Sequence, residues 1–242
     1  MDMSSPVALS GQIAMARRLE TIASNVANAG TVGYKSEAIA FSTVVSRTQP
    51  FSTSFALSGG PHPDLSSGGL RQTGNPLDVA VRGQGFLAIA TPVGTAYTRD
   101  GRLQMLPTGD LVTLQGHAVL DAGGAPIAAD PAGGVPEIGA DGTIRQNGRA
   151  LGVLGLFDLD LSRGYGRYEN SAFIPVAAPE PIVDFASEGI VQGFTEDSNV
   201  NPVLEMTRLI AVQRAFEAMS ASLEQRDQAL RETIQGLGAR GG

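Results

Sequence analysis

The side chains that could carry acid–base or nucleophilic chemistry are few and isolated. The 242-residue chain has two histidines, His62 and His117, a single lysine, Lys35, and no cysteine. The absence of cysteine excludes thiolate catalysis, disulfides and cysteine metal sites, and two histidines cannot form a three-histidine zinc site. No Gly-x-Ser-x-Gly elbow marks a nucleophilic serine. A Ser-His-Asp triad could still assemble in space, but nothing in the sequence favours one, so we expect no catalytic residues and no enzyme.

A pair of glycines, Gly83 and Gly85, matches part of a dinucleotide-binding fingerprint, with Asp100 downstream. That motif requires a helix directly after the glycines, because the free N–H groups at the helix N-terminus hold the pyrophosphate. The residues that follow, 86–90, are the apolar run FLAIA, which is typical of a strand. We therefore expect a tight hairpin or bulge at the glycines and no nucleotide cofactor.

An acidic stretch after residue 157 matches part of a calcium-loop template. Asp158, Asp160, Ser162 and Glu169 occupy positions one, three, five and twelve. Position six should be glycine for the sharp turn, but it is Arg163, whose charge would also repel the cation. The stretch therefore predicts a solvated strand end, and we expect no metal site.

The composition is that of a globular protein with an acidic surface. Hydrophobic residues make up 42% of the chain and the formal net charge is −7. Because there is no basic patch, nucleic acid is not expected as a partner. No run of about 18 apolar residues is present, so we expect no membrane span. The N-terminus lacks a basic region, and Gln12, Arg17 and Arg18 interrupt any apolar core, so no cleavable secretory signal is expected.

The C-terminal segment has the strongest periodicity in the chain. From Leu209 onward, apolar residues recur in alternating steps of three and four, which is a heptad pattern. The seam runs through Leu209, Val212, Phe216, Met219, Leu223 and Leu230. Asn201 is a suitable N-cap, Pro202 falls at the first helical position, and Gly236 and Gly238 favour the end of the helix. We expect one long helix with a narrow apolar stripe that needs a partner.

A second seam lies near the N-terminus. Ser5 and Pro6 repeat the cap-then-proline start, and Met15, Leu19, Ile22 and Val26 follow in the four-three-four step. We expect the two terminal helices to pair as a coiled coil. The alternative is two ordinary amphipathic helices packed on a core.

Between the helices the sequence changes character twice. Residues 36–69, rich in Ser, Thr, Gly and Pro, are expected to form an extended arm or long loop. Residues 70–191 show alternating apolar residues and recurrent turn dipeptides such as Asp141-Gly142 and Asn147-Gly148, which predict an antiparallel β-rich domain. The fold class is therefore α+β, with residues 1–35 and 192–242 forming a terminal helical domain around the inserted arm and β-rich domain.

Four runs resemble the bacterial flagellar basal-body rod and hook proteins. These are ASNVANAGTVGYK at 23–35, TGNPLDVAVRGQGF at 73–86, YTRDG at 97–101 and QGFTEDSNVNP at 192–202. The departures are Ala29-Gly30, where the family more often has Thr or another residue, and Tyr34 in place of the commoner Phe. The residues that carry the terminal motifs are Asn25, Asn28, Gly30, Gly33, Tyr34, Ser198, Asn199, Asn201 and Pro202.

The resemblance implies a structural axial subunit of the basal-body rod that assembles helically through its terminal helices. Its expected partners are other copies of itself, neighbouring proximal and distal rod proteins, and the type III export apparatus during secretion. The expected location is the rod in the periplasmic space, reached without a cleavable signal peptide. It implies no cofactor, and the two seams would form the assembly interface. The alternative is a self-contained β-sandwich binding module or hydrolase in which the helices only buttress the sandwich.

Overall fold

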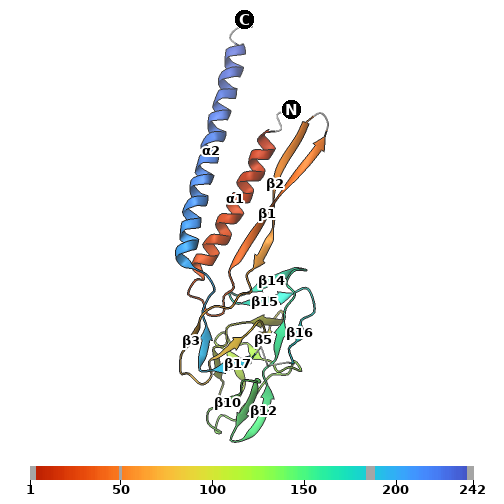
Figure 1. Cartoon of the computed structure of the whole chain (residues 1–242), viewed down its shortest axis with the longest axis vertical. Coiled ribbons are helices and arrows are strands. Elements are labelled where there is room, and N and C mark those ends of the chain that lie inside the picture. The colour runs from red at the N-terminus through yellow and green to blue at the C-terminus, as the bar shows by residue number, and fades with distance from the viewer. Residues whose placement is uncertain (1–3, 49–50, 184–188, 239–242) are drawn as a thin grey trace. The chain divides into compact units, whose positions relative to one another are not determined.

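The computed structural model describes residues 4–48, 51–183 and 189–238 and confirms the α+β class. Along the chain, an N-terminal helix, α1, comes first, a β-rich middle follows, and a C-terminal helix, α2, comes last (Figure 1). The chain divides into two compact units. The first contains residues 1–26, 37–62 and 201–242, and the second contains residues 27–36 and 63–200.

Helix α2 spans Pro202–Gly238 and begins where the sequence predicts. The Asn201 side-chain oxygen accepts a hydrogen bond from the Leu204 N–H at 3.1 Å, and its carbonyl accepts one from the Glu205 N–H at 3.0 Å. Pro202 fits the first turn because its missing N–H would have no partner there. The helix continues through Gly236, which does not end it.

Helix α1 spans Ser4–Ala27 and contacts α2 in antiparallel fashion within the first unit (Figure 1). The Gln12 amide donates to Ser220 Oγ at 3.4 Å, and the Asn25 amide donates to Glu205 Oε2 at 3.4 Å. Near the first of these contacts, a Cβ added at Gly11 would lie 2.9 Å from Met219 Cε, so the two helices approach closely there.

Strands β1 (Glu37–Thr48) and β2 (Phe51–Pro63) pair as a two-stranded sheet in the first unit. The stretch is extended, as the arm predicted from its composition would be, but it is paired and regular and does not form the alternative long loop. An extended chain satisfies its backbone N–H and C=O groups by pairing with itself, which Ser- and Thr-rich sequence does not prevent. The hairpin begins beside α1, since the Asn25 side chain bonds both the N–H and the C=O of Glu37 at 2.9 Å.

The second unit contains a nine-stranded sheet whose described pairings are antiparallel. Its main path runs in the order β14 (Tyr165–Tyr168), β15 (Ala172–Pro175), β6 (Gly94–Thr98), β5 (Phe86–Thr91), β9 (Ala118–Val119), β8 (Leu111–Thr113) and β7 (Leu103–Met105). Two further strands leave this path at β5, namely β13 (Leu156–Asp158) and, paired with it, β16 (Glu180–Pro181).

The described part of the second unit also contains three smaller sheets. They are β10 (Glu137–Ile138) with β11 (Thr143–Gln146) and β12 (Arg149–Val153); β17 (Gly189–Gln192) with β4 (Val79–Arg82); and β18 (Phe194–Glu196) with β3 (Leu70–Gln72). The predicted Asn147-Gly148 turn joins β11 to β12, with φ of 51° and 77°. Positive φ at both central residues is the geometry of a type I′ hairpin turn.

The glycines at 83 and 85 do not make the hairpin or bulge that the sequence predicts. They separate β4 from β5, and these strands pair in different sheets, β4 with β17 and β5 with β6, β9 and β13. A strand, β5, follows them as expected, so no helix N-terminus is present to hold a pyrophosphate.

The core of the second unit lies on both faces of β5. Successive side chains of a strand point to opposite faces, so Leu87 joins one apolar cluster and Phe86 another. The first cluster includes Val79, Leu111 and Ile190, and the second includes Phe173.

Candidate functional site

The two terminal motifs meet in the second unit. The segment that follows α1 runs beside the segment that precedes α2: the Gly33 N–H donates to the Glu196 carbonyl at 2.8 Å, and the Ser36 N–H donates to Asn199 Oδ1 at 2.7 Å. Lys35 Nζ lies 2.6 Å from Glu196 Oε1, and both side chains are 1% exposed. The sequence motifs at opposite ends of the chain are therefore one structural feature.

Arg99, from the third family-like run, completes this feature. Its Nη1 lies 3.0 Å from Glu196 Oε2 and its Nη2 donates to the Gly83 carbonyl at 2.7 Å. The Gly68 N–H donates to Glu196 Oε1 at 2.8 Å, so the carboxylate accepts from three donors. We call Lys35, Glu196 and Arg99 the ion cluster. Because burial disfavours the charged amine, the pKa of Lys35 is lowered, although its bond to Glu196 opposes the shift.

An aromatic stack adjoins the ion cluster. The Arg167 guanidinium lies 4.6 Å from the Tyr34 ring centre and 4.9 Å from that of Phe173, and it donates to the Lys35 carbonyl. The Phe173 ring meets Phe86 edge-on at 5.9 Å, and Arg99 lies 4.8 Å from the Phe86 ring centre. Cation–π contacts of this kind each contribute about 0.5–2 kcal/mol. The aromatic at position 34 is thus used for stacking on a cation.

The remaining motif residues shape the turns around the cluster. Gly33 has φ +69°, and a Cβ there would lie 2.4 Å from the Arg99 carbonyl carbon, so only glycine fits. The Asn28 side-chain oxygen accepts from Thr31 Oγ1 at 3.1 Å, and the Asn199 amide donates to the Asp64 carbonyl at 2.8 Å. Ser198 Oγ accepts from the Val200 N–H at 3.2 Å. Gly30 has open space around it, and nothing in the structure explains its glycine.

The two seams lie in the first unit. Ile22 and Val212 are buried, at 5% and 8% exposure. The other seam residues with described side chains are half-buried: Met15, Leu19, Val26, Leu209, Phe216, Met219 and Leu223. Leu230 lies in α2, but its side chain is outside the described residues. One chain therefore covers its own seams only in part.

Comparison with known proteins gives three family-model matches along the chain. Residues 6–35 match the flagella basal body rod protein model, residues 80–148 the flagellar hook protein FlgE/F/G D1 domain, and residues 191–236 the flagellar basal body rod FlgEFG protein C-terminal model. The flagellar basal-body rod protein FlgF of Mesorhizobium japonicum is 51% identical over 234 residues, which covers 97% of each chain. The chain belongs to the flagellar basal-body rod protein family.

Other relatives place the chain within the rod protein family. FlgF of Rhizobium meliloti is 44% identical over 96% of each chain, whereas FlgG of Bacillus subtilis is 30% identical over 93% of this chain and 96% of the relative. The chain length and the run from Ser198 to Arg208 predict a resemblance to the proximal rod protein FlgF first and to the distal rod protein FlgG next. These identities confirm that order.

The residues weighed for catalysis or metal binding do not converge in this rod family member. His117 Nε2 lies 3.0 Å from Glu169 Oε1 as a surface pair, and His62 is exposed in β2. Asp160 accepts bonds from its own turn, from the Ser162 N–H at 3.0 Å and the Ser162 hydroxyl at 2.5 Å, and these bonds lower the pKa of Asp160. Within the described ranges, no group of three or more metal-ligating side chains comes together. Neither described helix is apolar enough over 18 residues to cross a membrane.

Sequence reasoning did not identify Glu196, Arg99 or Arg167 as the partners of the motif residues. Each lies in a different strand or turn, and charge pairs between distant segments leave no periodic signal. It also missed a second apolar stripe on each helix, which remains exposed in the first unit: Leu9 and Ile13 on α1, and Val203, Met206 and Ile210 on α2. Their spacings of four, and of three and four, match a helical face and could have revealed them.

Proposed function

We propose that this chain is a non-enzymatic, structural axial subunit of the bacterial flagellar basal-body rod, and that it has the same place in the rod as its FlgF relatives. The observation that carries the proposal is the match of both chain ends to rod family models, together with 51% identity over nearly the whole length. The subunit would form part of the shaft that transmits torque from motor to hook and encloses the export channel. A self-contained binding module or hydrolase receives no support from these relatives.

The terminal helices are proposed to pair as a coiled coil. The contacts of Gln12 with Ser220 and of Asn25 with Glu205 support an antiparallel alignment, and the heptad spacing in both helices supports a continuous seam. The half-buried seam residues Phe216, Met219 and Leu223 would then be covered fully only in an assembly, as part of the interface with neighbouring subunits. As part of the same proposal, residues 1–35 and 192–242 form a terminal helical domain, residues 36–69 an arm, and residues 70–191 a β-rich domain.

The partners of this subunit are proposed from its family. They are other copies of the chain, the neighbouring proximal rod proteins, the distal rod protein FlgG, and the type III apparatus during export. Export would proceed without a cleavable signal, and the assembled rod would lie in the periplasmic space. The lack of cysteine suits passage as an unfolded chain, because no disulfide can form on the way.

Complementation tests this function. The chain, carrying an epitope insertion at the exposed Asn147-Gly148 turn, is expressed in a strain that lacks its own copy. We expect restored motility, and co-purification of the epitope with basal bodies at the proximal end of the rod. Full motility in the strain that lacks the chain, or absence of the epitope from intact basal bodies, would reject the proposal.

A further inference from the structure

The outer face of α1 carries an apolar pair followed by an acid. Leu9 and Ile13 are 57% and 47% exposed, and Glu20 is exposed one heptad after Ile13. Residues four and seven apart lie on one side of a helix, so the three side chains form one strip. This strip, Leu9, Ile13 and Glu20, we call the outer strip.

A hollow with complementary lining lies in the same unit between α1 and α2. It has a volume of about 210 Å³, and small or apolar side chains line it together with two cations: Met15, Arg18, Arg208, Ala211, Val212 and Ala215. Arg18 and Arg208 also line a second hollow of about 250 Å³ that includes Glu205 and the start of β1. The first hollow is therefore apolar at Ala215 and cationic at Arg18 and Arg208.

The spacing of apolar and charged groups is the same on both surfaces. Ile13 and Glu20 are seven residues apart on α1, and Ala215 and Arg208 are seven residues apart on α2, which is about 10.5 Å in each helix. In antiparallel alignment Ile13 meets Ala215 where Glu20 meets Arg208. Arg208 Nη1 already bonds Glu205 Oε1 at 2.5 Å, but a guanidinium has five N–H donors and can accept a second carboxylate.

If the outer strip fills the hollow, that strip must come from a second copy of the chain. Within one chain α1 supplies one wall of the hollow through Met15 and Arg18, so its opposite face cannot enter the same hollow. We propose that the outer strip of one copy docks in the α1–α2 hollow of the next. Since the two surfaces differ, the contact is heterologous, and repetition of such a contact builds rings or open helical polymers rather than closed dimers. This inference rests on the proposed function, because it assigns the surface through which the subunits contact one another.

Cysteine cross-linking of the full chain tests the contact, because the native sequence has no cysteine. Two variants are prepared, Ile13→Cys and Ala215→Cys, and each is oxidised alone and in equal mixture at concentrations where sedimentation shows association. We expect a disulfide-linked dimer in the mixture and little in either variant alone. Val176→Cys, at an exposed site in the second unit, mixed with Ala215→Cys gives the background of random collision.

A charge reversal adds a second readout. Glu20→Arg in the Ile13→Cys copy should lower the yield of the mixed dimer about threefold, the size expected for loss of an exposed ion pair. Glu224→Arg in the same copy, on an exposed part of α2, should leave the yield unchanged. Equal yields in the mixture and in either variant alone would overturn the inference, and so would a yield at the Val176→Cys background or failure of the chain to associate. If the yields were equal or at background, complementation with the native chain would still succeed, so the proposed function would stand.

Discussion

Lys35 Nζ and Glu196 Oε1 lie 2.6 Å apart in the interior of the second unit, although 161 positions separate the two residues in the chain. The contact ties the segment that leaves α1 to the segment that enters α2. Arg99 holds the other oxygen of the same carboxylate at 3.0 Å. Two buried cations thus share one carboxylate, which joins both terminal motifs within the second unit.

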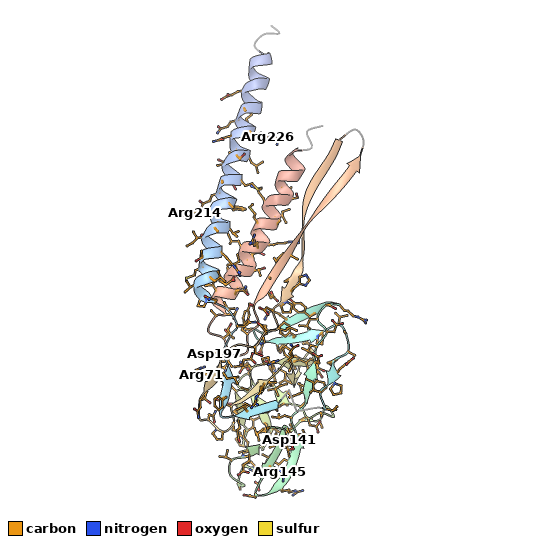
Figure 2. All side chains as sticks on the ribbon, in the orientation of Figure 1. Arg71, Asp141, Arg145, Asp197, Arg214 and Arg226 are labelled. Atoms are coloured by element: carbon orange, nitrogen blue, oxygen red, sulfur yellow. The ribbon has the colours of Figure 1, made fainter. Side chains whose placement is uncertain are left out.

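Glu196→Gln should destabilise the second unit strongly. The change removes the carboxylate that is bonded to both Lys35 and Arg99 and leaves these cations buried, and breaking a buried pair in this way costs about 3–5 kcal/mol. The measurement is the free energy of unfolding in urea, followed by the fluorescence of the tyrosines in this unit. Asp197→Asn is the matched control. Asp197 is the residue directly after Glu196, and its ion pair with Arg71 is exposed (Figure 2). That control should cost no more than about 1 kcal/mol, and equal losses in the two variants would refute a special role of the cluster.

Lys35 should resist amine-reactive reagents in the folded chain. Its side chain is 1% exposed, and it is the only lysine, so its modification is identified without ambiguity by peptide mass. An Arg149→Lys variant supplies an exposed lysine in the same molecule as an internal standard. We expect the standard to react fast and Lys35 to react at the rate of unfolding, and Glu196→Gln should accelerate Lys35 alone. Equal rates for both lysines in the unaltered cluster would contradict its burial.

The lowered pKa of Lys35 predicts a gain of stability with rising pH in the alkaline range. Between the lowered pKa and the ordinary value of 10.5, the unfolded chain binds more protons at Lys35 than the folded chain, so the free energy of unfolding rises with pH. Burial also raises the pKa of Tyr97, and that shift lowers stability as the pH passes 10.0. Tyr97 is present both in the native chain and in the Lys35→Met variant, so its contribution cancels in the difference between their free energies of unfolding. The native chain should gain stability relative to this variant as the pH rises through the window, and a constant difference would disprove the shift.

Gly33→Ala should destabilise the second unit, whereas Gly30→Ala should not. A Cβ at Gly33 would lie 2.4 Å from two backbone atoms of the Arg99–Asp100 bond, and φ there is +69°. Strain of this kind costs about 1–3 kcal/mol, and the contact with backbone adds to it. Nothing lies within 4 Å of a Cβ at Gly30, so the same substitution there changes stability by less than about 1 kcal/mol. Urea unfolding of both variants measures the difference, and similar values would mean that the turn adapts.

The helices could be predicted from the sequence and the ion cluster could not, for a physical reason. The helical period repeats along Leu209, Val212 and Phe216, so local spacing alone indicates the buried face, and the cap at Asn201 marks its start. The partner of Lys35 is chosen by the fold of the whole second unit, and no local pattern points to Glu196. The β1–β2 pairing was missed because Ser and Thr are compatible with loop and strand alike. The glycines at 83 and 85 look like a hairpin locally, but the strands on either side pair in different sheets.

A charge in the middle of the α2 seam should abolish assembly and leave the second unit folded. Phe216→Asp and Leu223→Asp place a carboxylate at half-buried positions of the α2 seam, which faces α1 in the proposed coiled coil and a neighbouring subunit in the proposed rod. Burial of an unpaired charge costs several kcal/mol, so the helix cannot dock. Ala221→Asp, at an exposed position of the same helix between these two sites, is the control for the added charge itself.

Motility and recovery of intact rods measure assembly, and urea unfolding measures the second unit. We expect loss of motility with Phe216→Asp, retention with Ala221→Asp, and unchanged unfolding of the second unit in both, because the seam lies in the first unit. Normal motility with Phe216→Asp and with Leu223→Asp would show that the seam takes no part in the rod.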